Sequence, residues 1–376
     1  YGTQVAGGVG LYFSDMLGDH NLGVVVQANG TFKDIGGQVG YLNRKRRINY
    51  GASIGHIPLL YGFQSIDPAT LTIDQIRQRI FIDNVDIGGS YPFSTTRRAD
   101  LSVGFVRYGF DYEIDRFVLN GVYSRERISV PKCSDSSSGF CSPDAVYFVQ
   151  STLAYVGDFS NFAFTSPVQG GRYRVQVSPF VGSETFVRLV ADYRRYFFAK
   201  PVTFAFRGMH LGNYGEVDAG SLFTEEYLGY ANTLTHIRGY SFSSFEPNEC
   251  TPDESGTRCV EVERLRGTRL ALASAEIRLP LLGSEAFGLL NFPYLPTEIS
   301  LFADAGLAWS AGETPKLKFV DEIVPGQPIE RVPVISAGVS SRFNLFGYMV
   351  LEIFYAYPFQ RPVKGGYVGF QLIPGW

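Results

Sequence analysis

Residues 297–309 read TEISLFADAGLAW, and this stretch has two different faces if it is extended. Successive side chains of a β-strand point to opposite sides. The odd positions are Ile299, Leu301, Ala303, Ala305, Leu307 and Trp309, and the even positions are Glu298, Ser300, Phe302, Asp304, Gly306 and Ala308. The stretch therefore predicts a β-strand with one apolar face and one face that carries charge and glycine.

The same two-residue period recurs along the whole chain. In 271–279 the odd positions are apolar, whereas the even ones include Glu276 and Arg278. In 186–197 the even positions carry Arg188, Asp192 and Arg194. Helical periodicity is nearly absent, so we predict an all-β antiparallel fold, with residues 1–376 forming a single barrel domain.

Composition favours a barrel in a membrane. Aromatic residues make up 15% of the chain, glycines number 42, and charged residues reach only 18%. No run of about 18 apolar residues exists, but a barrel strand needs only about 9–11 alternating residues. A soluble β-sandwich has the same alternation with its charges facing water. The aromatic content, the number of strands and the end of the chain favour the transmembrane barrel, whose lumen is polar.

The last strand, within 366–375, places Phe370, Leu372, Pro374 and Trp376 on one face, next to Gly375. An aromatic end of this kind resembles the C-terminal signal of bacterial outer-membrane barrels. We therefore expect an outer-membrane location with the C-terminus in the periplasm. Counting strands back gives 15 if 97–126 is one long strand, with a sixteenth upstream of Tyr1, or 16 if it is the two strands 97–111 and 114–126.

Four cysteines lie in polar loops, as the pairs Cys133/Cys141 and Cys250/Cys259. Their spacing fits neither a CxxC redox motif nor a zinc site. We predict the two disulfides Cys133–Cys141 and Cys250–Cys259, as is usual outside the cytoplasm. Free thiols in each loop are the alternative. The long connections expected are 58–77, 127–143, 211–264 and 310–330.

The longest connection contains Ile237-Arg238-Gly239-Tyr240. A polar loop that folds into a wide lumen needs an anchor, and arginine offers a planar fork that binds carboxylates bidentately. Glu276 and Asp304 face inward on neighbouring predicted strands and could receive it. Gly239 permits a tight turn, and Tyr240 can pack while its hydroxyl finds a partner.

These residues resemble the BamA/TamA superfamily of outer-membrane assembly and secretion barrels, the bacterial surface antigen family. Ile237–Tyr240 matches the (V/I)RG(F/Y) tip of the family's sixth loop, and Phe302, Asp304 and Gly306 match its FxDxG strand. The resemblance implies that loop 6 folds into the lumen and that Glu276 is an acidic partner of Arg238. The stretch from Phe13 to His20 and the turn at Asn43 and Arg44 look like a branch in which the barrel follows a TolB-type propeller. A periplasmic domain, either POTRA repeats or a propeller, is then expected outside this chain.

The resemblance implies insertion or translocation of client proteins through a lateral gate between the first and last strands. Pro374 and Gly375 would weaken pairing there, because proline donates no ladder hydrogen bond. The alternative is a passive pore or a membrane-anchor subunit of an outer-membrane complex, with loop 6 as its plug.

We expect no enzymatic activity, cofactor or metal. The four histidines are scattered, and no nucleophile has an obvious base. The expected partners are outer-membrane lipid or lipopolysaccharide, client barrels or secreted proteins, and periplasmic or lipoprotein subunits. The basic run from Arg44 to Arg47 offers a contact with lipid phosphates, or is simply a solvated hairpin end. A net charge of −3 gives no field for nucleic acid.

Overall fold

The computed structural model consists almost entirely of β-strands. It describes residues 6–29, 32–67, 72–118, 124–135, 140–217, 221, 223–229, 234–241, 244–256, 258–284, 288–292, 294–319, 328–347, 349–361 and 363–373. The predicted all-β class is confirmed by an eighteen-stranded sheet, in which β9 and β16 have two residues each. No helix in the described part of the chain is long and apolar enough to cross a membrane.

Two compact units make up the chain. The first comprises residues 1–93, 99–153 and 178–185. Its elements are β1 (Ala6–Ser14), β2 (His20–Asn29), η1 (Phe32–Asp34), β3 (Ile35–Asn43), β4 (Asn49–Asp67), β5 (Thr72–Pro92), most of β6 (Arg97–Val118), β7 (Ser124–Ser129) and η2 (Cys133–Asp135). From β1 to β5 each strand pairs antiparallel with the next. Strands β8 (Val146–Asp158) and β10 (Pro167–Gly182) contribute residues to both units.

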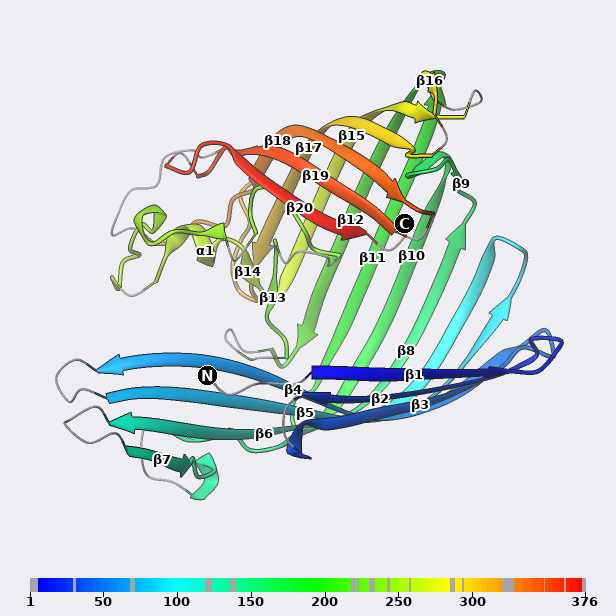
Figure 1. Cartoon of the computed structure of the whole chain (residues 1–376). Coiled ribbons are helices and arrows are strands. Elements are labelled where there is room, and N and C mark those ends of the chain that lie inside the picture. The colour runs from blue at the N-terminus through cyan, green and yellow to red at the C-terminus, as the bar shows by residue number, and fades with distance from the viewer. Residues whose placement is uncertain are drawn as a thin grey trace. The chain divides into compact units, whose positions relative to one another are not determined.

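The second unit comprises residues 94–98, 154–177 and 186–376. Its remaining elements are β9 (Asn161–Phe162), β11 (Phe186–Ala199), β12 (Val202–Gly215), β13 (Glu226–Tyr227), η4 (Pro247–Glu249), α1 (Val260–Glu263), β14 (Arg266–Gly267), β15 (Arg269–Gly283), β16 (Leu290–Asn291), β17 (Thr297–Trp309), β18 (Val334–Leu345), β19 (Met349–Pro358) and β20 (Tyr367–Ile373). The antiparallel order β11–β12–β15–β17–β18–β19–β20 can be followed in Figure 1.

The boundaries expected in the first unit need two corrections. Residues 97–118 form one strand, and β7 then returns antiparallel along it, so neither 97–126 nor 114–126 is a strand. Most of 58–77, expected as a loop, is strand at the ends of β4 and β5. Both errors have one cause, because charged cross-strand pairs extend these strands. Arg116 binds both carboxylate oxygens of Asp74 at 2.9 Å.

The burial of alternate residues settles which face of the strands is apolar. In β17 the exposed positions include Ile299 and Leu301, whereas Glu298 and Asp304 are buried. In β19 Ile353 is exposed, whereas its neighbours Glu352 and Phe354, on the other face, are buried. A soluble sandwich would place these charges in water. The inverted arrangement is the one that a bilayer requires, with apolar side chains outward and polar ones inward.

The long connection after β12 packs against the buried face of the second unit. Its residues Leu228, Ile237 and Tyr240 form a cluster with inward side chains of the wall. The other members of the cluster are Leu265 of the same connection and, from the wall, Val190, Met209, Leu211, Leu270, Leu272, Ala308 and Val334. Ile237 has no exposed surface, so the loop tip belongs to the packed interior of this unit.

Candidate functional site

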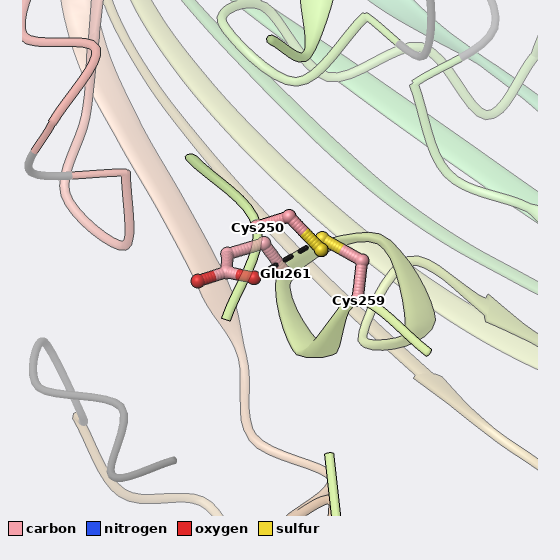
Figure 2. A group of neighbouring side chains, drawn as sticks. All are labelled: Cys250, Cys259 and Glu261. Atoms are coloured by element: carbon pink, nitrogen blue, oxygen red, sulfur yellow. Dashed lines mark hydrogen bonds between the residues drawn. The ribbon is translucent and has the colours of Figure 1, made fainter. Parts of the chain in front are cut away.

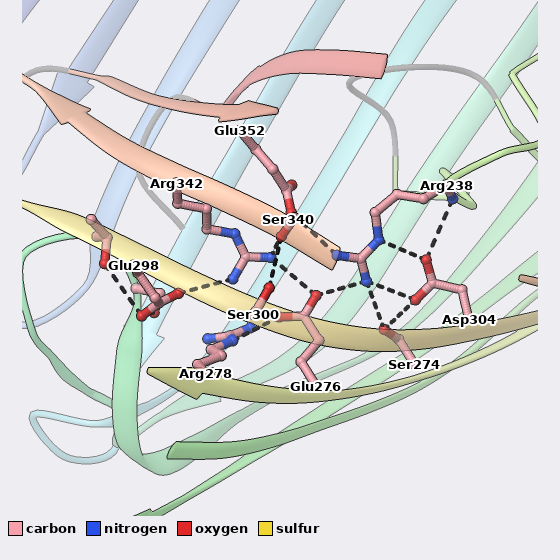
Figure 3. A network of polar contacts seen from close by, with 12 residues as sticks. Arg238, Ser274, Glu276, Arg278, Glu298, Ser300, Asp304, Ser340, Arg342 and Glu352 are labelled. Atoms are coloured by element: carbon pink, nitrogen blue, oxygen red, sulfur yellow. Dashed lines mark hydrogen bonds and ion pairs between the residues drawn. The ribbon is translucent and has the colours of Figure 1, made fainter. Parts of the chain in front are cut away.

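Arg238, at the tip of the loop, binds Asp304 of β17 with both arms of its guanidinium group. Its Nε lies 2.8 Å from Oδ2 and its Nη2 lies 2.8 Å from Oδ1 of the carboxylate. The backbone N–H of Arg238 also points at Oδ2, at 3.4 Å. Figure 3 shows the two side chains facing each other across the short gap between loop and wall. This bidentate arrangement is the strongest geometry for such a pair.

Two further carboxylates complete the surroundings of Arg238. Its Nη2 lies 2.7 Å from Glu276 of β15, and its Nη1 lies 3.2 Å from Glu352 of β19. All of these side chains are at most 6% exposed. A single loop residue therefore ties together β15, β17 and β19, and Glu276 and Asp304 are among its partners.

The positive charge of Arg238 alone does not balance the acids around it. Arg342 of β18 binds Glu276, Glu298 and Glu352 at 3.0, 3.2 and 3.1 Å. Arg278 of β15 binds Glu276 at 2.7 Å. Buried charges persist when each one has an opposite charge close to it. The cluster meets that requirement with three arginines and four carboxylates (Figure 3).

Strand register explains how the cluster forms. Glu298 pairs with Arg342 across β17 and β18, and Arg342 pairs with Glu352 across β18 and β19. Glu352 in turn pairs with Gln371 of β20, whose amide donates to it at 2.6 Å. Directly opposed partners of opposite charge stabilise neighbouring strands. These four side chains therefore form a polar row that crosses β17, β18 and β19 and ends on the last strand, β20.

The FxDxG residues each have a distinct contact with the loop. The guanidinium carbon of Arg238 lies 3.6 Å from the centre of the Phe302 ring, close enough for a cation–π interaction. Asp304 supplies the bidentate carboxylate, as above. Gly306 leaves space for Ile237, whose Cδ1 would lie 2.0 Å from a β-carbon at residue 306. The motif thus provides an aromatic surface, a charge and a hollow.

The other residues of the tip are also fitted to the wall. Gly239 has a φ of 89°, and a β-carbon there would lie 3.3 Å from side-chain atoms of Ala356 and Pro358. The Tyr240 hydroxyl lies 2.7 Å from Oε1 of Gln360 and accepts the backbone N–H of that residue at 3.1 Å. Burial raises the pKa of Tyr240, so its hydroxyl keeps its proton for these contacts.

A second arginine, in the connection between β19 and β20, holds the loop from the other side. Arg361 binds both oxygens of Glu249 at 2.8 Å and donates to the backbone oxygen of Gly239 at 2.7 Å. It also donates to Oγ and the backbone oxygen of Ser244. Burial by itself would raise the pKa of Glu249, but the hydrogen bonds and charge of Arg361, the backbone N–H of Glu246 and the charge of Lys364 together hold this pKa below its usual range.

The cysteine pairs differ in the structure. Cys133 and Cys141 form the predicted disulfide. Cys250 and Cys259 are free thiols, so the predicted disulfide between them is wrong. The Cys259 thiol instead donates to the Glu261 carboxylate at 3.3 Å (Figure 2).

Glu261 also accepts hydrogen bonds from the backbone N–H and hydroxyl of Thr251, and these contacts close the turn without a covalent bond. In the described part of the chain, Cys250, Cys259 and Glu261 are the group whose donor atoms could share a metal, lying within 4.8 Å of one another. Thr251 already donates two hydrogen bonds to the Glu261 carboxylate, so we interpret this group as part of a turn and not as a metal site.

The residues singled out in the last strand are only partly described. Phe370 and Leu372 are exposed, at 75% and 46%. Their neighbour Gln371 points the other way, to Glu352. Pro374, Gly375 and Trp376 lie outside the described residues.

Sequence reasoning missed Arg342, Glu298, Glu352 and Arg361. The first three lie on the inward face of their strands, and this face could be recognised from the two-residue period. A charged residue on the inward face was therefore the signal that could have identified them. Arg361 stands in a turn, where no period marks a face. No local pattern indicated it.

Comparisons with known proteins agree with this geometry. The profile of one protein family, described as the Omp85 superfamily domain, matches residues 142–375. The structure is similar to that of BamA from Haemophilus ducreyi lacking POTRA domains 1-3, with a TM-score of 0.58 and 15% identity over 98% of this chain and 66% of that one. It is also similar to CdiB from Escherichia coli, with a TM-score of 0.54 and 11% identity over 98% of this chain and 59% of that one.

The chain therefore spans less than two thirds of the length of these two proteins. No curated protein matches its sequence.

Proposed function

We propose that this chain, which belongs to the Omp85 superfamily, assists the insertion or translocation of client proteins at the bacterial outer membrane. Clients would enter through a lateral gate between the first and last strands of the barrel. A client strand would pair with an exposed strand edge, since main-chain hydrogen bonds alone give such additions their affinity.

The observation that carries the proposal is the anchoring of Arg238 to three strands. Asp304, Glu276 and Glu352 fix the loop tip to β17, β15 and β19 at once. Because β19 is the partner of β20, the anchor holds the wall up to the last strand but not the last strand itself. A gate requires such a boundary between a fixed wall and a strand that separates.

The properties of β20 support its role as the moving strand. It has seven residues and pairs with ten-residue β19 from Tyr367 to Ile373. Its polar link to the anchored cluster is the single Gln371–Glu352 hydrogen bond among the described residues of the strand. Pro374, next in the sequence, has no backbone N–H to donate to a strand ladder.

The test is a scan of cysteine pairs along Ala6–Ser14 and Tyr367–Ile373 in the full-length protein, with Cys250 and Cys259 replaced by serine. Cross-linking is expected to stop insertion of an unfolded barrel client into lipid vesicles, and reduction is expected to restore it. Each single cysteine serves as the control. Quantitative cross-linking with undiminished insertion would refute the gate.

The second candidate is a passive pore or anchoring subunit with loop 6 as its plug. The specific observation in its favour is the pair of clamps, since Arg238 and Arg361 hold the loop from two sides. A fixed plug predicts that Arg361→Ala opens a stable conductance in planar bilayers without any client. The gate predicts that conductance needs a client.

The proposed surroundings follow from the same reasoning. Exposed apolar residues such as Ile299, Leu301 and Ile353 would face lipid or lipopolysaccharide, with the C-terminus in the periplasm. The proposed partners are client proteins and periplasmic or lipoprotein subunits.

A further inference from the structure

A cavity of about 430 Å³ lies beside the Arg238 cluster, within the second unit. Its lining contains twice as many arginines as carboxylates. The part nearest Arg238 is balanced, because Arg278 and Arg342 face the buried acids described above. The excess positive charge therefore lies in the rest of the lining, on β6, β10, β11 and β12.

Arg194 of β11 and Arg207 of β12 are directly opposed in the strand register. Like charges in this position destabilise a strand pair. Both guanidinium groups bind one carboxylate, Asp192, at distances from 2.8 to 3.2 Å. The two arginines thus share the carboxylate of Asp192, and both arginine side chains are no more than 16% exposed.

Two more arginines from β10 face the same cavity with little compensation. Arg174 donates through Nε and Nη2 to Oε1 of Gln176, which is a neutral acceptor. Among the described residues, no carboxylate lies within ion-pair distance of Arg174. Arg172 reaches Asp158 only at 3.7 Å, and both side chains are more than two fifths exposed. Such a pair contributes little in water.

We propose that these arginines form a binding site for a phosphate-bearing anion. Guanidinium groups match phosphate oxygens in bidentate geometry, and several of them suit a phosphomonoester with two charges. The cavity volume falls in the range of sites for small ligands or headgroups. The site is independent of the gate and of client transport.

The loop tip forms one side of the site. Arg207 donates through Nη2 to the backbone oxygen of Leu234. Leu234 lies three residues before the loop tip, which begins at Ile237. His236 and Arg238 also line the cavity. A bound phosphate would therefore lie between the wall and the loop and would strengthen their contact, since it adds acceptors for Arg207 and Arg174.

The test is binding of tripolyphosphate to the purified full-length protein in detergent, measured by titration calorimetry. R174Q is expected to bind about tenfold more weakly or worse, because a charge-assisted hydrogen bond is lost. R195Q is the matched control. Arg195 is the neighbour of Arg194 on β11, stacks on Phe159 and Phe197, and lies outside the cavity lining. It loses the same charge and is expected to bind as the original protein does.

R174K separates charge from geometry and is expected to retain part of the affinity. The heat-dependent gel mobility of each variant verifies its folding. Vesicles containing a phosphomonoester lipid are then added as competitor. Competition identifies a lipid headgroup as the source of the phosphate, and lack of competition with retained tripolyphosphate binding identifies a soluble one. Equal affinity of R174Q and R195Q, or no binding by the original protein, would overturn the site.

Discussion

The Cδ1 atom of Ile237 occupies the space beside Gly306, only 2.0 Å from where a β-carbon at residue 306 would stand. A side chain at residue 306 would therefore force the Ile237 side chain to shift if the loop tip is to stay docked. Ile237 is fully buried within a packed cluster, so such a shift would require its neighbours to repack.

Gly306→Ala is expected to destabilise loop docking by about 1–3 kcal/mol, the usual cost of overpacking a filled interior. Limited proteolysis should cut the loop faster, and the unfolding temperature should fall. Gly208→Ala on β12 is the control, because nothing lies within 4 Å of a β-carbon there. Equal protease resistance of the two variants would show that the contact does not limit docking.

Arg238→Ala is expected to cost about 3–5 kcal/mol, since it leaves Asp304 buried without its cation, whereas Glu276 and Glu352 keep Arg342. Arg238→Lys keeps the charge but not the bidentate fork, so its effect should be intermediate. Thermal unfolding and loop proteolysis measure both. Arg258→Ala, an exposed arginine of the same loop, is the control. Normal heat-modifiability with an unchanged cleavage rate in Arg238→Ala would contradict the anchor.

Arg361→Ala should loosen a different part of the loop. Glu249 loses its arginine partner and Ser244 loses two donors, while Arg238 keeps Asp304. Hydrogen exchange is expected to rise most in 244–250 and less at the Arg238 end. Glu249→Gln removes the carboxylate but keeps an acceptor, and should show a smaller change. A uniform rise along the loop would mean that the two clamps act as one.

The sequence predicted the strand class and the identity of the loop anchor because both depend on local patterns. Period-2 alternation marks which residues share a face, so Asp304 and Glu276 could be assigned inward from their own strands. The Arg-Gly pair of the tip, at 238 and 239, marks a turn with a charged end. That these acids pair with Arg238 was implied by the resemblance of the loop tip and of the FxDxG strand to the superfamily's motifs.

The missing parts of the site depend on pairing between strands. Arg342 meets Glu298 and Glu352 only because β18 lies between β17 and β19 in one particular register. A shift of one residue would turn each side chain to the other face. Arg361 reaches Gly239 across 122 positions of sequence. Such contacts follow from the assembled sheet and cannot be read from any single segment.

Acid is expected to weaken loop docking through His236. Burial, assisted by the positive charge of Arg238, lowers the pKa of His236 to about 4, although Asp304 and Glu352 act in the opposite direction. The unfolded chain takes up the proton below about pH 6.5 while the folded protein does not. The stabilisation is therefore complete above about pH 6.5 and is lost as the pH falls towards 4, to a limit of about 3 kcal/mol.

The check is loop proteolysis at about pH 7.5 and about pH 5. The original protein should become more sensitive at the lower pH, and His236→Gln, which cannot take up a proton, should lose most of this difference. The ring of Phe354 lies 6.0 Å from that of His236 and does not titrate, so it adds no pH dependence of its own. An identical pH dependence in both proteins would assign the effect to other groups.

The two cysteine pairs should differ in their reaction with alkylating reagents. Cys133 and Cys141 are bonded, whereas Cys250 and Cys259 are thiols. Burial is the largest of the factors that raise the pKa of Cys259 to about 12, and the nearby Glu261 carboxylate adds to it. Since the thiolate is the reactive form, Cys259 should react slowly while the protein is folded. Cys250 is exposed and should react first.

Mass spectrometry of the unreduced protein is expected to show one fast adduct, at Cys250, and a second at Cys259 only after denaturation. Reduction should add the two at Cys133 and Cys141. Glu261→Gln removes the negative charge beside Cys259 and should speed its reaction without changing that of Cys250. If denaturation without reduction yields no adduct at either loop cysteine, the pair is oxidised and the turn is closed by a covalent bond after all.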